Sequence, residues 1–237
     1  VELGLITLKG TKSLANIMFI LGLATAAGIL YMSFLNTGST SNAYYSAIIA
    51  LIGVLVGYFY TAKPIRLSSR YGLGELSIFL SFGPLLTLGT GFAIANETIL
   101  LYSNEFYNLL LLGVPIGLLT TNILFINQYP DHASDKKVGK NHLVVLLGKK
   151  ASRWIYALNL ILALGSLYFI AENILTGTKQ MLFLYVLIPI TMFYSYFLLS
   201  GLFKYYNSRK LIKYNIHTIY FHMFFSFIYM VILANFQ

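Results

Sequence analysis

The stretch FYNLLLLGVPIGLLTTNILFI, from Phe106 to Ile126, decides the fold class, because it is long, apolar and free of charged residues. A bilayer core of about 30 Å needs roughly 20 apolar residues in one helix, so this stretch predicts a transmembrane span. Six further stretches have the same character. The seven predicted spans are residues 14–34, 44–60, 75–96, 106–126, 153–170, 181–203 and 217–236.

The composition of the whole chain agrees with a membrane protein. Hydrophobic residues make up 58% of the 237 residues and charged residues only 10%, against about 25% charged residues in a soluble domain. No long linker or low-complexity tract interrupts the spans. We therefore expect an all-α, polytopic transmembrane helix bundle that forms a single domain over residues 1–237.

The basic residues are distributed asymmetrically around the predicted spans. All of them except Lys179 lie before the first span or in the connections after the second, fourth and sixth spans. The positive-inside rule therefore predicts that these connections face the cytoplasm, in a cytoplasmic membrane. The net charge of +9 is thus explained by membrane topology, and we expect no nucleic-acid partner.

Two features of the chain concern its chemistry and its extent. It contains no cysteine, which excludes disulfides, thiolate nucleophiles and cysteine-bound clusters. It begins at Val1 without a signal-peptide pattern. We therefore expect it to be a piece of a longer gene product.

The polar segment 127–140 holds the strongest candidate for chemistry. Asn127, Asp131 and Asp135 follow one another at four-residue spacing, so in a helix their side chains share one face. Two carboxylates this close repel each other by about 3 kcal/mol unless a cation lies between them. Hard divalent ions such as Mg²⁺ prefer such oxygen ligands. The alternative is that these residues only cap a helix in a polar loop.

A second polar segment, residues 60–75, carries three cations, Lys63, Arg66 and Arg70. Pro64 and two glycines interrupt any helix there, which predicts a short flexible connection. Two spans separate this segment from residues 127–140, so both emerge on the same membrane face, where a bundle can bring them together. A polyphosphate would then bridge a carboxylate-bound Mg²⁺ and the basic side chains. Alternatively, the cations are topogenic charges that contact anionic lipids.

These two segments resemble the signatures of the UbiA superfamily of intramembrane aromatic prenyltransferases. The spacing Asn127-x-x-x-Asp131-x-x-x-Asp135 is similar to the second aspartate-rich motif of that superfamily. Residues 137–148, 60–67, 72–75 and 82–84 are similar to the branch that prenylates 1,4-dihydroxy-2-naphthoate in menaquinone synthesis. The resemblance extends over nearly the whole chain.

The resemblance implies Mg²⁺-dependent transfer of a polyprenyl chain from a prenyl diphosphate to an aromatic acceptor, with 1,4-dihydroxy-2-naphthoate the first candidate. It implies that a dry tunnel between helices holds the isoprenoid tail. By the same resemblance, Asp131, Asp135 and Asn127 form the catalytic metal site. The residues implied in substrate binding are Lys63, Arg66, Tyr60, Arg70 and Lys137.

The chain also departs from the superfamily pattern. Family members have nine spans and a first aspartate-rich motif, and neither that motif nor two of the spans is present here. We therefore expect this fragment by itself to be inactive. The alternatives are a prenyltransferase of another branch, with 4-hydroxybenzoate or a different aromatic acceptor, and a cation-coupled membrane transporter. The sequence leaves the prenyl length and the oligomeric state open.

Overall fold

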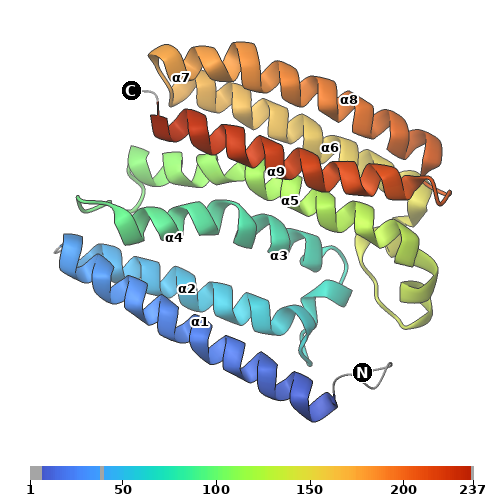
Figure 1. Ribbon diagram of the computed structural model, residues 1–237, viewed down its shortest axis with the longest axis horizontal. Coiled ribbons are helices and arrows are strands. Elements are labelled where there is room, and N and C mark those ends of the chain that lie inside the picture. Colours follow the sequence, from blue (N-terminus) through green and yellow to red (C-terminus); the bar gives the residue numbers. More distant parts are fainter. Residues whose placement is uncertain (1–6, 38–39, 236–237) are drawn as a thin grey trace.

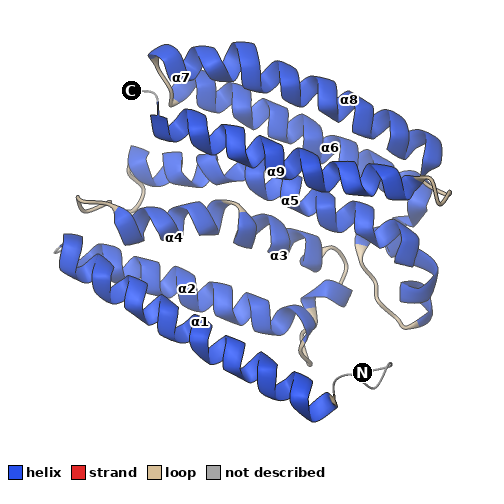
Figure 2. Ribbon diagram, in the orientation of Figure 1, coloured by secondary structure: helices blue, strands red, loops and turns tan. Residues whose placement is uncertain are grey.

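The computed structural model describes residues 7–37 and 40–235 as a bundle of roughly parallel and antiparallel helices (Figures 1 and 2). No β-strand occurs in these two ranges. Within the described residues, seven helices or pairs of helices are long and apolar enough to cross a membrane, which confirms the predicted fold class and number of spans. The helices are α1 Leu8–Thr37, α2 Thr40–Thr61, α3 Leu73–Phe82, α4 Pro84–Ile94, α5 Asn104–Lys137, α6 Leu143–Asn173, α7 Gly177–Leu182, α8 Ile188–Tyr205 and α9 Leu211–Asn235.

Several helices are longer than the predicted spans. α5 continues past Ile126 to Lys137, so most of the segment 127–140 is helix and not a loop. α6 begins at Leu143, ten residues before the predicted start at Arg153, and contains a non-helical break at Gly148. Hydropathy detects only the apolar part of a helix and misses polar turns outside the bilayer core. Residue 236, the predicted end of the last span, lies outside the described residues.

The third span is broken in its middle, where α3 ends at Phe82 and α4 begins at Pro84. Gly83 lies at the break, and a Cβ atom there would meet the Gly113 carbonyl oxygen and the Gly117 Cα, each at 2.8 Å. The backbones of the break and of α5 are therefore in close contact. Small residues spaced four apart allow such an approach between membrane helices. The predicted third span, residues 75–96, was continuous and did not include this break.

α5 occupies the centre of the bundle and packs against α3, α4, α6 and α9. Its inward face buries apolar side chains such as Phe125 and Ile126. It also carries Asn122, whose Nδ2 donates to the Tyr156 carbonyl oxygen at 3.2 Å and whose Oδ1 accepts from Asn159 Nδ2 at 2.9 Å. These bonds satisfy polar groups that would otherwise be costly in an apolar interior.

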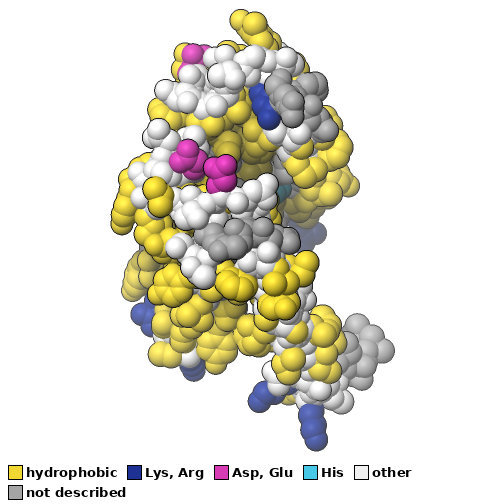
Figure 3. All heavy atoms as spheres, turned by 90° about the vertical axis from the view of Figure 1, so that its left-hand side faces the viewer, with side chains coloured by type: hydrophobic (Ala, Val, Ile, Leu, Met, Phe, Trp, Pro, Cys, Tyr) yellow, Lys and Arg dark blue, Asp and Glu magenta, His cyan; other side chains and the backbone are white. Residues whose placement is uncertain are grey.

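The connections of the bundle alternate between two ends (Figure 1). The end at the right of Figure 1 carries loops 62–72, 138–142 and 206–210, and we call it the basic end because these loops and the flanking helix ends hold most Lys and Arg residues. Figure 3 looks onto the opposite end, where acidic side chains are visible near the middle of the face. This arrangement places both predicted functional segments at the basic end.

Candidate active site at the basic end

The part of α5 beyond Ile126 carries the three residues predicted to hold a metal. The helix continues through Pro130 to Lys137, so Asn127, Asp131 and Asp135 lie on one helix face. Asn127 and Asp131 are exposed, and Asp135 is half-buried. The shared helix face agrees with the predicted spacing. The alternative, in which these residues only cap a helix in a polar loop, does not agree with a helix that continues to Lys137.

Asp135 is held by two neighbours from the connection between α5 and α6. Its Oδ1 accepts from Lys140 Nζ at 2.8 Å, and its Oδ2 lies 3.1 Å from His142 Nε2. His142 caps α6 through Nδ1, which accepts a hydrogen bond from the Val145 amide. Since Nδ1 is an acceptor, Nε2 carries the hydrogen and donates it to Asp135. Asp135 therefore has a fixed orientation.

Asp131 differs from Asp135 in having no such partner. Within the described part of the chain its carboxylate forms no ion pair or hydrogen bond. Asn127, one turn earlier, accepts a hydrogen bond of 2.6 Å from Asn215 Nδ2 on α9. The face thus combines one free carboxylate, one oriented carboxylate and one amide oxygen tied to α9.

The two polar segments meet at the basic end, as the sequence predicted. The Tyr71 amide donates to the Asn141 carbonyl oxygen at 2.8 Å, and the Asn141 amide donates to the Ser69 carbonyl oxygen at 3.1 Å. These bonds form a short parallel bridge between Arg70 and Asn141. The loop that follows α2 is therefore attached to the connection that follows the carboxylate face.

Glu75 strengthens the same junction, although the sequence analysis gave it no role. It is only 4% exposed. Its Oε1 accepts from Gln128 Nε2 at 3.1 Å and from the Leu143 amide at 3.0 Å. The residue thereby joins the starts of α3 and α6 to α5 beside Asn127. The available sequence signal was an acidic residue at the start of an apolar helix, directly after the segment Gly72-Leu73-Gly74.

The predicted cations lie close to the junction but do not pair with the carboxylates. Arg70 Nη2 donates to the Pro64 carbonyl oxygen at 2.7 Å, inside its own loop. Arg66 is half-buried with φ 47°, and Lys63 and Lys137 are exposed. Among the described residues, no ion pair connects any of them to Asp131 or Asp135. The structure therefore brings the backbones of the two polar segments together. It leaves the side chains of Lys63, Arg66 and Lys137 available to a ligand.

Tyr60 lies at the end of α2, where it lines a cavity of about 330 Å³ between α2 and α3. Gly57, Ser77 and Phe82 line the same cavity. The Tyr60 side chain is half-buried. The lining also includes Gly53 and Val56, so the cavity extends along about two turns of α2 from Tyr60.

Comparison with known proteins identifies the family. The model of the UbiA prenyltransferase family matches residues 3–228. The chain belongs to this family. No solved structure matches it significantly.

Curated UbiA relatives share moderate identity with the chain. A 2-carboxy-1,4-naphthoquinone phytyltransferase of Synechocystis sp. is 32% identical over 161 residues, which are 65% of this chain and 46% of the relative. A 1,4-dihydroxy-2-naphthoate octaprenyltransferase of Bacillus subtilis is 30% identical over 112 residues, 47% of this chain and 33% of the relative. The chain thus spans less than half the length of these two UbiA proteins.

The oxygen ligands on α5 are compatible with Mg²⁺ in a UbiA protein. Mg²⁺ commonly uses one or two protein carboxylates and completes its coordination with water and substrate phosphates. Asp131 is free to ligate, and Asp135 is already oriented. Among the described residues no group of three or more His, Asp or Glu is arranged to hold a metal by itself. The face therefore suits an ion that is shared with a bound phosphate.

Proposed function

We propose that this chain belongs to the membrane domain of a Mg²⁺-dependent prenyltransferase, which transfers a polyprenyl chain from prenyl diphosphate to an aromatic acceptor. The observation that carries the proposal is the open carboxylate face of α5 beside the loop that follows α2. Among the described residues, Asp131 on this face and Lys63 and Arg66 in the loop form no ion pair. A diphosphate group has the charge and the oxygen atoms to bind both sides.

The reaction is an electrophilic aromatic substitution. The allylic C–O bond breaks, and diphosphate leaves with the electron pair. The electron-rich ring attacks the allylic carbon, a C–C bond forms, and the attacked ring carbon releases its own substituent. That substituent is a proton at a C–H carbon, or CO2 at the carbon that bears a carboxylate. When bound, Mg²⁺ offsets the negative charge that develops on the leaving diphosphate.

Each proposed residue has a part in managing this charge. Asp131 and Asp135 would hold the ion, and Asn127, whose side chain is fixed by Asn215, would orient the ligand set. The substrate contacts would come from the predicted basic residues and a tyrosine, whose ring face stabilises the allylic cation. These residues are Lys63, Arg66, Arg70, Lys137 and Tyr60. The apolar helices around the site exclude water, which would otherwise capture the cation.

The proposed acceptor is 1,4-dihydroxy-2-naphthoate, and the reaction would then serve menaquinone synthesis. The support comes from relatives named for naphthoate and naphthoquinone prenylation in three bacteria, including a 1,4-dihydroxy-2-naphthoate octaprenyltransferase of Haemophilus influenzae that is 27% identical over 76% of this chain and 56% of the relative. The isoprenoid tail of the donor is apolar and partitions into the bilayer. The proposal therefore also fits an integral membrane site.

The proposed reaction is tested with membranes that contain the full-length protein. Radiolabelled prenyl diphosphate is supplied with either dihydroxynaphthoate or 4-hydroxybenzoate, with and without Mg²⁺, and label in lipid-soluble product is measured. We expect metal-dependent product with dihydroxynaphthoate alone. Product with hydroxybenzoate instead would retain the chemistry and overturn the acceptor. No product with any aromatic acceptor, together with cation uptake into vesicles, would favour a transporter.

We further propose that the basic end faces the cytoplasm, on the strength of the positive-inside rule. The natural absence of cysteine allows a direct test with single cysteines. Ser208→Cys at the basic end and Asn96→Cys at the opposite end are both exposed positions. In intact cells, a membrane-impermeant maleimide should label only Asn96→Cys, and permeabilisation should make Ser208→Cys reactive. Labelling of Ser208→Cys in intact cells would reverse the orientation.

A further inference from the structure

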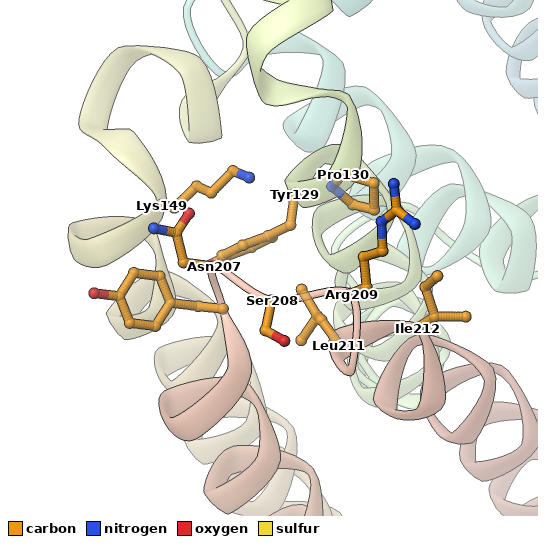
Figure 4. Close-up of a pocket in the computed structure, with 9 residues that line it drawn as sticks. Tyr129, Pro130, Lys149, Asn207, Ser208, Arg209, Leu211 and Ile212 are labelled. Atoms are coloured by element: carbon orange, nitrogen blue, oxygen red, sulfur yellow. The ribbon is translucent and has the colours of Figure 1, made fainter.

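A separate pocket of about 480 Å³ lies at the basic end, between α5, α6 and the turn that joins α8 to α9 (Figure 4). Its volume is within the range of small-ligand sites. α5 contributes Tyr129 and Pro130. Tyr129 lies about 200° around the helix from Asn127, at about 100° per residue. Tyr129 therefore belongs to a different face of α5 from the proposed metal ligands, and Pro130, about 60° around the helix from Asn127, lies between the two faces. The remaining lining residues are Lys149, Tyr206, Asn207, Ser208, Arg209, Leu211 and Ile212.

The lining of this pocket is cationic and polar. It includes Lys149 and Arg209 and no acidic residue. In Figure 4 both side chains extend toward the part of the pocket formed by Tyr129 and Pro130, one on each side. Within the described part of the chain neither forms an ion pair. Two unpaired cations that converge on one cavity attract an anion.

The walls of the pocket are fixed by contacts outside it. The Arg153 guanidinium lies 4.2 Å from the centre of the Tyr206 ring, and its Nη1 donates to the Phe203 carbonyl oxygen at 2.9 Å. On the other wall, the Tyr129 hydroxyl accepts from Ser152 Oγ at 3.0 Å. The cavity is therefore formed before a ligand enters, which reduces the entropy lost on binding.

Recognition in this pocket depends on side chains. The Leu211 and Ile212 amides at the start of α9 already donate to the carbonyl oxygens of Ser208 and Arg209. Lys149 and Arg209 supply charged donors, and the exposed Asn207 supplies an amide donor. Guanidinium and ammonium groups together with an amide are the donors that bind phosphate oxygens.

We propose that this pocket binds a phosphate group at the membrane surface, separately from the proposed metal site. The group has two possible sources: the headgroup of an anionic phospholipid, and a free polyphosphate. Basic pockets between membrane helices bind anionic lipid headgroups in this way. The site does not depend on the proposed prenyl transfer, because its residues are not among those assigned to the reaction.

The test measures equilibrium binding to the purified chain in neutral detergent. The probes are radiolabelled phosphatidylglycerol, phosphatidylcholine and inorganic pyrophosphate, all in the presence of a chelator that removes Mg²⁺-dependent binding at Asp131 and Asp135. The pocket variant combines Lys149→Ala with Arg209→Ala. The matched control combines Lys204→Ala with Lys213→Ala, which removes the same charge from the same end outside the pocket lining. Thermal unfolding of each variant confirms that it is folded.

We expect the pocket variant to bind its anionic probe about 30-fold more weakly and the control variant to bind it within about threefold of the parent chain. Loss confined to phosphatidylglycerol identifies a lipid headgroup as the ligand, and loss confined to pyrophosphate identifies a free polyphosphate. Equal weakening in both variants would overturn the site in favour of general charge attraction. If neither phosphatidylglycerol nor pyrophosphate binds to the parent chain, the proposed site is overturned as well. If the alanine variant does not fold, Lys149→Gln with Arg209→Gln replaces it.

Discussion

Replacing Asp131 with Asn in the full-length protein is expected to lower Mg²⁺-dependent prenyl transfer by about 100-fold or more, the scale of losing one group that stabilises developing charge. Asp131 is the carboxylate with no partner among the described residues, so its charge is fully available to a metal. Asp135→Asn should have a similar effect, and it also weakens the ion pair with Lys140 at 2.8 Å. Initial rates at a series of Mg²⁺ concentrations check both variants.

The control for these variants is Glu97→Gln, which removes an exposed acidic charge at the opposite end of the bundle. Its rate should equal that of the parent protein. All variants should insert into the membrane, because both aspartates lie in the polar last turns of α5, beyond its apolar part. Near-normal activity in both aspartate variants would remove them from the metal site.

Replacing Gly117 with Leu is expected to give the largest loss of stability. A Cβ atom at this position would meet the Phe79 carbonyl oxygen at 2.5 Å and the Gly83 Cα at 3.0 Å. Both obstacles are backbone atoms, so they cannot rotate away as a side chain would. Overpacking of this kind costs about 3 kcal/mol, which corresponds to a fall in Tm of about 10 °C for a chain of this size.

Gly165→Leu in α6 is the matched control, because nothing lies within 4 Å of a Cβ atom built there. It introduces the same side chain into another membrane helix without displacing a neighbour. Unfolding of the detergent-solubilised variants, followed by circular dichroism, compares them directly. Equal Tm values for the two variants would show that the contact between the α3–α4 break and α5 does not limit stability.

The number of spans was predictable because the cost of polar groups in lipid governs the sequence of every helix. Each span must be about 20 residues of apolar composition, and each connection must be polar. The break at Gly83 was not predictable on this basis. Hydropathy records neither Pro84, which lacks an amide hydrogen and begins α4, nor the close approach of Gly113 and Gly117 to Gly83.

The candidate site was predictable to about the same extent as the fold. The four-residue spacing of Asn127, Asp131 and Asp135 requires only that α5 remain helical, and it does. The partners of Asp135 were not predictable in the same way. His142 reaches it only because the connection between α5 and α6 turns back and places the His142 ring at the start of α6. Glu75 was missed for a related reason, since its partners are far away in the sequence.

Those distant partners of Glu75 impose an order on biosynthesis. Its hydrogen-bond donors, Gln128 and the Leu143 amide, are 53 and 68 residues further along the chain. At about 5–20 residues per second, the ribosome needs roughly 3 to 14 seconds to add these two residues after it has added Glu75. During that interval the carboxylate has no protein partner, and burial in lipid would be costly. We therefore expect the start of α3 to remain in the hydrated interface at first. It reaches its final position in the bundle only after α5 and the beginning of α6 have been synthesised.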